Sequence, residues 1–235
     1  MLKFLVPFAA VIAVPVSAQD TSRLDKRAEL VRTYSAQYAD YWNGQKGRGK
    51  ATVYLPSQFE IPQQYATSVT KAERQLMGRR LRALVDFILA QPALQDADVE
   101  VSVEPTLYRV NLDGGYLQMI LDFKIQKGSD KADFQLWTNP YAASGEVWRN
   151  VGTAAGGCRR EQLASGMRQG IERLRVGKAG PGGGTAIRAL EIVSPTLRFK
   201  PSDEPYWDAE SITGRIAALG YNLDCTKLLA LSNTP

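Results

Sequence analysis

Hydrophobic positions follow a helical period in three parts of the chain. In residues 22–42 the apolar and aromatic side chains recur every three or four positions, which is the spacing of one helix face. Residues 70–91 show the same spacing, and they begin with Thr70 and Glu73 at the separation of a capping box. A shorter helix is predicted over residues 209–219. The pattern therefore predicts helices near both ends of the chain.

A period of two replaces the helical period in the middle of the chain. From residue 98 onward, apolar side chains alternate with polar ones, as expected for strands with one wet face. The predicted strands are residues 51–55, 98–104, 106–112, 116–126 and 133–137. Because short, turn-forming segments separate the last four, these strands are expected to form an antiparallel meander.

Residues 159–176 return to the spacing of a helix. Their apolar positions are Leu163, Met167, Ile171 and Leu174. A helix is therefore predicted there, followed by strands at residues 186–193 and 196–199. The glycine-rich residues 179–184 lie between that helix and the next strand. A phosphate-binding loop has a strand before it and a helix after it, so this stretch is predicted to be a plain connection.

These elements together predict the α+β class. The expected architecture is an antiparallel β-meander sheet with helices packed on one face and one disulfide. Residues 19–235 are enough for a single domain, and an N-terminal helical subregion over residues 19–92 is the alternative division.

The first 18 residues have the pattern of a secretory signal peptide. Lys3 precedes an apolar run, residues 4–16, and the small residues Ser17 and Ala18 follow it. The run is shorter than the roughly 20 residues that a membrane-spanning helix needs. Cleavage is expected between Ala18 and Gln19, which would make the mature protein periplasmic or secreted. No later segment of the sequence is apolar enough to predict a transmembrane helix.

Export makes the two cysteines and the absence of histidine informative. Cys158 and Cys225 form an even pair, and in an oxidising compartment such a pair is expected to be a disulfide. The chain has no histidine, which excludes Ser-His-Asp triads, Cys-His pairs and zinc sites that contain histidine. We expect no metal and no cofactor. The net charge of +5, or +4 once Lys3 is removed, is too small to indicate nucleic acid as a partner.

Two groups of side chains are candidates for binding. The first is aromatic and lies at or near the ends of predicted elements: Trp137, Tyr141, Trp148, Tyr206 and Trp207. The alternative for these residues is that each covers an edge of the core. The second group, Arg79, Arg80 and Arg82, lies on the polar side of the helix predicted over residues 70–91. It is either a docking surface for anionic partners or a solvated helix face.

These features favour an exported, non-enzymatic binding or assembly protein of the cell envelope with a protein or cell-wall partner. The alternative is a carboxylate-dependent hydrolase acting on envelope glycan. Its candidate acids surround Tyr206 and Trp207 in the sequence: Asp203, Glu204, Asp208 and Glu210. Two carboxyl groups that converge in a cleft would favour the enzyme, whereas a flat aromatic patch would favour binding.

Overall fold

A computed structural model describes residues 18–56, 59, 70–108, 116–140, 147–165, 172–178, 186–193 and 208–234. The helices are α1 (Ala18–Gly44), α2 (Lys71–Leu89), α3 (Ile212–Asn222) and α4 (Cys225–Leu231), with a short 3-10 helix η2 (Pro92–Leu94). The strands are β1 (Thr52–Tyr54), β2 (Asp98–Tyr108), β3 (Tyr116–Lys127), β4 (Asp130–Thr138), β5 (Val147–Thr153), β6 (Arg159–Ser165), β7 (Glu172–Gly177) and β8 (Ala189–Val193). The α+β class is confirmed.

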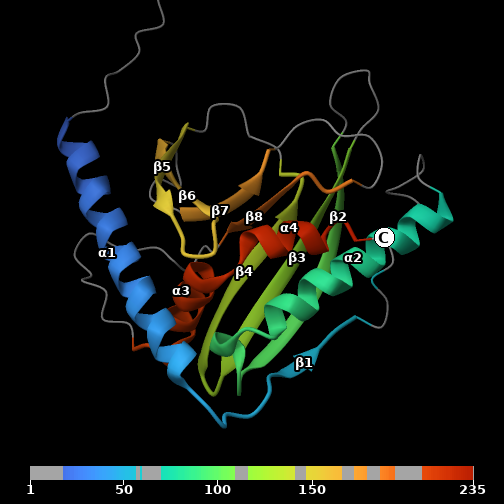
Figure 1. Cartoon of the computed structure of the whole chain (residues 1–235), viewed down its shortest axis with the longest axis horizontal. Coiled ribbons are helices and arrows are strands. Elements are labelled where there is room, and N and C mark those ends of the chain that lie inside the picture. Colours follow the sequence, from blue (N-terminus) through green and yellow to red (C-terminus); the bar gives the residue numbers. More distant parts are fainter. Residues whose placement is uncertain are drawn as a thin grey trace, which may run out of the picture.

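All eight strands belong to one sheet, in the order β1-β2-β3-β4-β8-β7-β6-β5 (Figure 1). Two runs of consecutive antiparallel strands, β2–β4 and β5–β8, meet where β4 pairs with β8. Only the short edge strand β1 is parallel to its neighbour. The sheet is thus larger than the predicted meander, and its strand order reverses direction at the β4–β8 pair.

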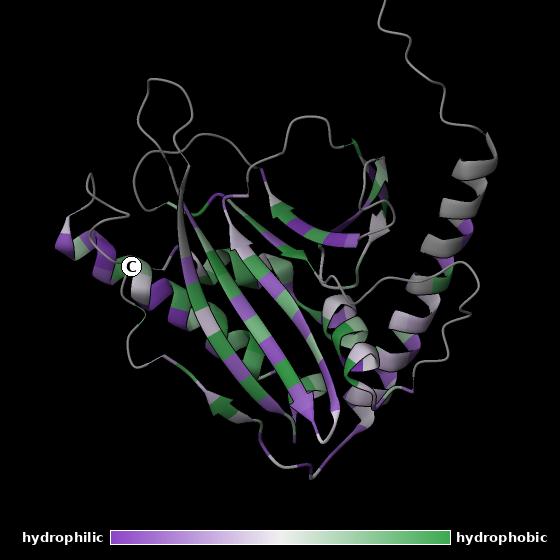
Figure 2. Ribbon diagram, turned by 180° about the vertical axis from the view of Figure 1, so that it is seen from behind, coloured by the Kyte–Doolittle hydropathy of each residue, from purple (hydrophilic) through white to green (hydrophobic). Residues whose placement is uncertain are grey.

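The helices α2, α3 and α4 lie over the same side of strands β2–β4, as comparison of Figures 1 and 2 shows. Side chains of the strands alternate between that side and the opposite one. On the helix side Phe123 stacks on Phe134 across the β3–β4 pair, with ring centroids 4.6 Å apart. These rings are completely buried together with Met77, Leu81 and Ile88 of α2. Burial of this apolar layer is the main stabilising term of the fold.

Helix α2 begins as the sequence predicts. The Thr70 hydroxyl accepts a hydrogen bond from the Glu73 backbone N–H at 3.2 Å, and the Glu73 carboxylate accepts one from the Thr70 N–H at 2.7 Å. The capping box is therefore confirmed. The hydrogen bond from the Thr70 backbone N–H is the main cause that lowers the pKa of Glu73 below its ordinary value. Gly78 is required in the buried stripe, because a Cβ there would lie 2.5 Å from the Phe59 carbonyl oxygen.

The helix predicted over residues 159–176 is wrong, because β6 and β7 lie there and form an antiparallel pair. The prediction assumed that the charged residues of this segment face water. Instead, Arg160, Glu161, Glu172 and Arg173 are all less than 10% exposed. Cross-strand ion pairs satisfy these charges, so the strands lack the clean alternation of apolar and polar residues. The glycine-rich stretch consequently connects two strands, and its residues 179–185 lie outside the described part of the chain.

Three further elements differ from the sequence prediction. A break was expected at Pro105, but strand β2 continues through it. Strand β1 pairs with β2 only as far as Glu100, so the missing N–H of Pro105 leaves no strand partner unsatisfied. Strand β5 occupies residues 147–153, where a loop was predicted. Helix α4 was not predicted, and residues 196–199 lie outside the described ranges.

The disulfide between Cys158 and Cys225 is confirmed. It joins the turn before β6 to the first residue of α4, with a Cα–Cα distance of 5.3 Å and a sequence separation of 67. Both cysteines are buried. The Cys225 N–H also donates to the Gly156 carbonyl at 2.9 Å, and a Cβ at Gly156 would lie only 1.8 Å from the Leu223 carbonyl oxygen. The turn and α4 are therefore in direct backbone contact beside the bond.

Within the described residues, no helix is both long enough and apolar enough to cross a membrane. The predicted signal peptide lies outside the described part of the chain except for Ala18, which is the first residue of α1. Removal of these residues stays a prediction.

Candidate functional site

Two of the predicted binding residues, Trp137 and Trp148, lie on the same face of the sheet. Trp137 of β4 is directly opposite Glu191 of β8, and partners in register point to the same side. Glu191 forms an ion pair with Arg173 at 3.1 Å, and the Arg173 guanidinium lies 3.7 Å from the centroid of the Trp148 ring. This is the side opposite the helices, since Leu136 and Ile192, which alternate with Trp137 and Glu191, belong to the core. We call this surface the tryptophan face.

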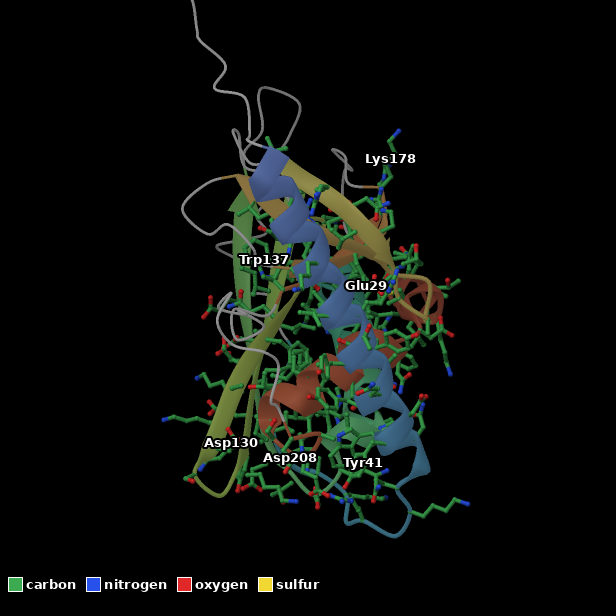
Figure 3. The ribbon with its side chains drawn as sticks, turned by 90° about the vertical axis from the view of Figure 1, so that its left-hand side faces the viewer. Glu29, Tyr41, Asp130, Trp137, Lys178 and Asp208 are labelled. Atoms are coloured by element: carbon green, nitrogen blue, oxygen red, sulfur yellow. A yellow bond between two sulfur atoms is a disulfide. The ribbon has the colours of Figure 1, made fainter. Side chains whose placement is uncertain are left out.

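Both tryptophans are partly exposed, and neighbouring side chains hold their rings in place. The indole N–H of Trp137 donates to the Gln135 side chain at 3.0 Å, and the stack on Arg173 fixes the plane of the Trp148 ring. Trp137 lies toward the end of β4 away from Asp130, which marks the start of the strand (Figure 3). The tryptophan face therefore presents aromatic rings of set orientation.

A buried ion network supports the tryptophan face. Arg173 pairs with Glu161 at 2.7 Å and with Glu191 at 3.1 Å, and these three side chains are 6%, 11% and 7% exposed. Burial raises the pKa of Glu191 despite the attraction of Arg173 and Arg175. Burial likewise lowers the pKa of Arg175, with help from the like charge of Arg173. Removing Arg173 would take away the ion-pair partner of Glu191 and leave Glu161 with Arg159 alone, at 3.6 Å.

The remaining predicted binding residues have mixed positions. Tyr141, Tyr206 and Trp207 lie outside the described residues. Arg79 of α2 is exposed. Arg80 donates to the Thr234 carbonyl at 2.9 Å and so ties α2 to the end of the chain. Arg82 pairs with Asp86 at 2.9 Å, one helical turn away. Docking of anionic partners on α2 stays a prediction, and Arg79 and Arg82 are the exposed members of the group.

A small hollow lies on the helix side of the same strands, between β6–β8 and α3. Its walls are mainly apolar and include Leu174, Ile192, Ile216 and Leu219. Arg160 and Glu172 also line it and pair with each other at 3.0 Å. Glu172 is the single acid among the described residues that line it. We call this feature the α3 hollow.

Sequence reasoning missed the α3 hollow because it assigned β6 and β7 to a helix. A signal was nevertheless present. Residues 159–162 read Arg-Arg-Glu-Gln and residues 172–175 read Glu-Arg-Leu-Arg, so antiparallel pairing places Glu161 opposite Arg173 and brings Arg160 diagonally next to Glu172. Such complementary pairs stabilise neighbouring strands.

Of the acids around Tyr206 and Trp207 proposed for the hydrolase alternative, Asp208 and Glu210 lie in the described part of the chain. Asp203 and Glu204 lie outside the described residues. Asp208 accepts a hydrogen bond from the Glu210 N–H at 3.1 Å. Glu210 itself binds Arg48 and the Tyr41 hydroxyl, at the end of α1 that lies close to Asp208 (Figure 3). The cap of α3 is Ser211, whose hydroxyl accepts from the Gly214 N–H at 3.1 Å.

Glu210 belongs to a cluster around Trp42 that joins α1, η2 and α3. Two guanidinium groups lie over the Trp42 ring, that of Arg215 at 4.1 Å and that of Arg48 at 4.6 Å from its centroid. Hydrogen bonds from Arg48 and then Tyr41 lower the pKa of Glu210 to about 2. At neutral pH this carboxylate is therefore ionised and paired, which makes it unsuitable as a proton donor for catalysis.

The low pKa of Glu210 predicts an acid-dependent loss of stability. Its folded-state pKa of about 2 lies below the ordinary value of 4.5. The stabilisation is therefore complete above about pH 5 and is lost as the pH falls from 4.5 through 2. Glu210→Gln should lower the free energy of unfolding at pH 7, and this difference should shrink toward zero near pH 2. Urea denaturation over a pH series measures it.

Glu100→Gln is the matched control, because Glu100 forms only an exposed pair with Lys124 at 3.7 Å. That variant should unfold like the parent at every pH. If the deficit of Glu210→Gln is the same at pH 2.5 and pH 7, the interpretation of the Glu210 pKa is wrong.

In the part of the chain that the structure describes, no three Cys, Asp or Glu side chains gather into a possible metal site. No protein-family model, curated protein or solved structure matches this chain. The function is therefore inferred from the tryptophan face and the α3 hollow.

Proposed function

We propose that this chain is an exported, non-enzymatic binding or assembly protein of the cell envelope, and that it contacts its partner through the tryptophan face. The observation that carries the proposal is the placement of Trp137 and Trp148. They come from separate strands and lie on one side of the sheet, where Trp137 is the register partner of Glu191 and Trp148 stacks on Arg173, the ion-pair partner of Glu191. Tryptophan and arginine are the residues that most often dominate binding energy at interfaces.

The arrangement of the acids supports binding over hydrolysis. Glycoside cleavage needs two carboxyl groups on either side of the scissile bond, with space for the substrate between them. Glu161 and Glu191 approach each other, but the Arg173 guanidinium lies between them and pairs with both. The α3 hollow has a single acid among its described lining residues. The buried disulfide suits a protein that functions outside the cytoplasm.

The partner is proposed to be a protein or a cell-wall component with a flat surface. Rings held in a fixed orientation lose little conformational entropy when they bind, so a flat aromatic platform binds well without rearrangement. Nucleic acid and catalysis have no part in this proposal.

Alanine substitutions on the tryptophan face test the proposal. The full mature chain is incubated with isolated native envelopes, and the bound fraction is measured by co-sedimentation over a range of protein concentrations. Trp148→Ala should weaken binding at least about tenfold, which corresponds to about 1.4 kcal/mol, and Trp137→Ala should act in the same direction. Tyr54→Ala is the control, because this side chain is 59% exposed on the opposite edge strand β1.

Equal binding by the parent and both tryptophan variants would refute the proposal. A loss in the Tyr54 variant as large as that in the Trp148 variant would do so as well, because it would indicate non-specific adhesion of aromatic side chains. Release of soluble sugar fragments from purified cell wall by the protein would favour the hydrolase instead.

A further inference from the structure

One arginine on the tryptophan face has no ion-pair partner among the described residues. Arg175 of β7 is partly exposed, and its Nε is covered without a hydrogen-bond acceptor. The two nearby carboxylates, those of Glu161 and Glu191, both pair with Arg173 instead. A guanidinium group that is partly removed from water usually has hydrogen-bond partners, so this one requires an explanation.

The sheet places Arg175 in a row of side chains that crosses the tryptophan face. Successive register partners on four neighbouring strands form this row: Trp137, Glu191, Arg175 and Arg159. Arg175 and Arg159 therefore stand directly opposite each other, and like charges in that position are unfavourable. Burial lowers the pKa of Arg175, and the like charge of Arg173 adds to this effect. An anion bound beside Arg175 would relieve each of these effects.

The charges of β6–β8 on this face leave room for one further anion. They belong to five side chains: Arg159, Glu161, Arg173, Arg175 and Glu191. Three arginines against two glutamates give a formal charge of +1, and the acids of β2–β4 lie at least two strands away from Arg175. A single net charge attracts an anionic membrane by only about 1 kcal/mol, so a lipid surface is a poor match. One discrete carboxylate would instead complete the set of ion pairs.

We propose that the tryptophan face docks an acidic segment of a partner protein, and that Arg175 receives an aspartate or glutamate side chain of that segment. The planar guanidinium group of Arg175 donates hydrogen bonds to the carboxylate. Trp137 and Arg175 are two strand spacings apart, about 10 Å, a length that roughly three extended residues span. The residues flanking the acid therefore reach the tryptophan rings. This docking mode rests on the proposed function and adds the class of partner to it.

Co-sedimentation of the full mature chain with native envelopes tests the docking mode. Arg175→Gln should bind at least about tenfold more weakly than the parent, because the carboxylate of the partner loses its donor. Conversion of the envelope carboxylates to neutral amides, with carbodiimide and ethanolamine, should weaken the parent to the same extent and leave Arg175→Gln almost unchanged. Arg32→Gln is the matched control and should bind like the parent, because Arg32 is 51% exposed on α1 and already pairs with Glu29.

The tryptophan variants distinguish failure of the docking mode from failure of the proposed function. Trp148→Ala should lose affinity yet keep the difference between native and amidated envelopes, because the carboxylate still meets Arg175. If both tryptophan variants lose affinity while Arg175→Gln binds like the parent, the face is an interface but its acidic partner is wrong. If all three variants bind like the parent, the docking mode and the proposed function are both wrong.

Protease treatment of the envelopes distinguishes a protein partner from a cell-wall polymer. Digestion should abolish binding of the parent, and undiminished binding to digested envelopes would overturn the assignment to a protein.

The melting temperature tests whether Arg175 serves the fold instead. Arg175→Gln should melt at or above the temperature of the parent, because it removes like-charge contacts with Arg159 and Arg173. A variant that melts several degrees lower would overturn the docking mode, since Arg175 would then stabilise the chain itself.

Discussion

Replacing Cys158 and Cys225 together by alanine is expected to lower the free energy of unfolding by about 4 kcal/mol. The bond closes a loop across a sequence separation of 67, and opening a loop of that length restores much conformational entropy to the unfolded chain. The loss should be large relative to the total, because domains of this size are only marginally stable. Chemical denaturation followed by circular dichroism measures it in the parent and the variant.

Reduction of the parent protein provides the matched comparison. Because both cysteines are buried, a reductant should act only when the protein unfolds, and the reduced parent should then be as unstable as the double variant. A double variant that unfolds within about 1 kcal/mol of the oxidised parent would contradict the expected role of the bond.

Arg215→Met is expected to destabilise the protein by about 3–5 kcal/mol. The Arg215 side chain is completely buried, stacks on Trp42, and pairs with Asp96 at 3.0 Å. It also donates to the backbone carbonyls of Gln95 at 2.7 Å and Glu210 at 3.0 Å. Methionine fills a similar volume but leaves the two backbone carbonyls without this donor and removes one ion pair of Asp96, which keeps its pair with Lys127, and that penalty accounts for most of the expected loss.

Arg48→Met is the matched control for this prediction, because Arg48 also stacks on Trp42 but is 18% exposed. It also pairs with Glu210, but solvent can replace part of that interaction, so the loss should be about 1 kcal/mol. Equal losses in the two variants, measured by urea denaturation at pH 7, would show that burial of Arg215 is not what makes it important.

The tryptophan face and the α3 hollow differ in how well the sequence alone could reveal them. Trp137 and Trp148 were candidates because tryptophans near the ends of elements are unusual enough to be noticed one by one. The sequence did not indicate the burial of Arg160, Gln162 and Glu172, because polar residues are expected to face water. The pairing of β6 with β7, and the packing of α3 from farther along the chain against this side of them, place these polar groups in the interior.

Local interactions are what the amino-acid sequence determined by itself. The capping box of α2 and the Ser211 cap of α3 form within a few residues, and the apolar stripe of α2 repeats within one helix, so their patterns are visible in the chain. The disulfide was also foreseen, because two cysteines leave a single intramolecular pairing. The tertiary structure alone decided the strands β5–β7, the reversal of strand order at β4 and β8, and the burial of Arg160, Arg173 and Arg215. The β4–β8 pair and the burial of Arg215 depend on contacts between residues far apart in the chain. Strands β6 and β7 are neighbours in the sequence, but α3, from farther along the chain, packs against them, and buried ion pairs then satisfy their charges.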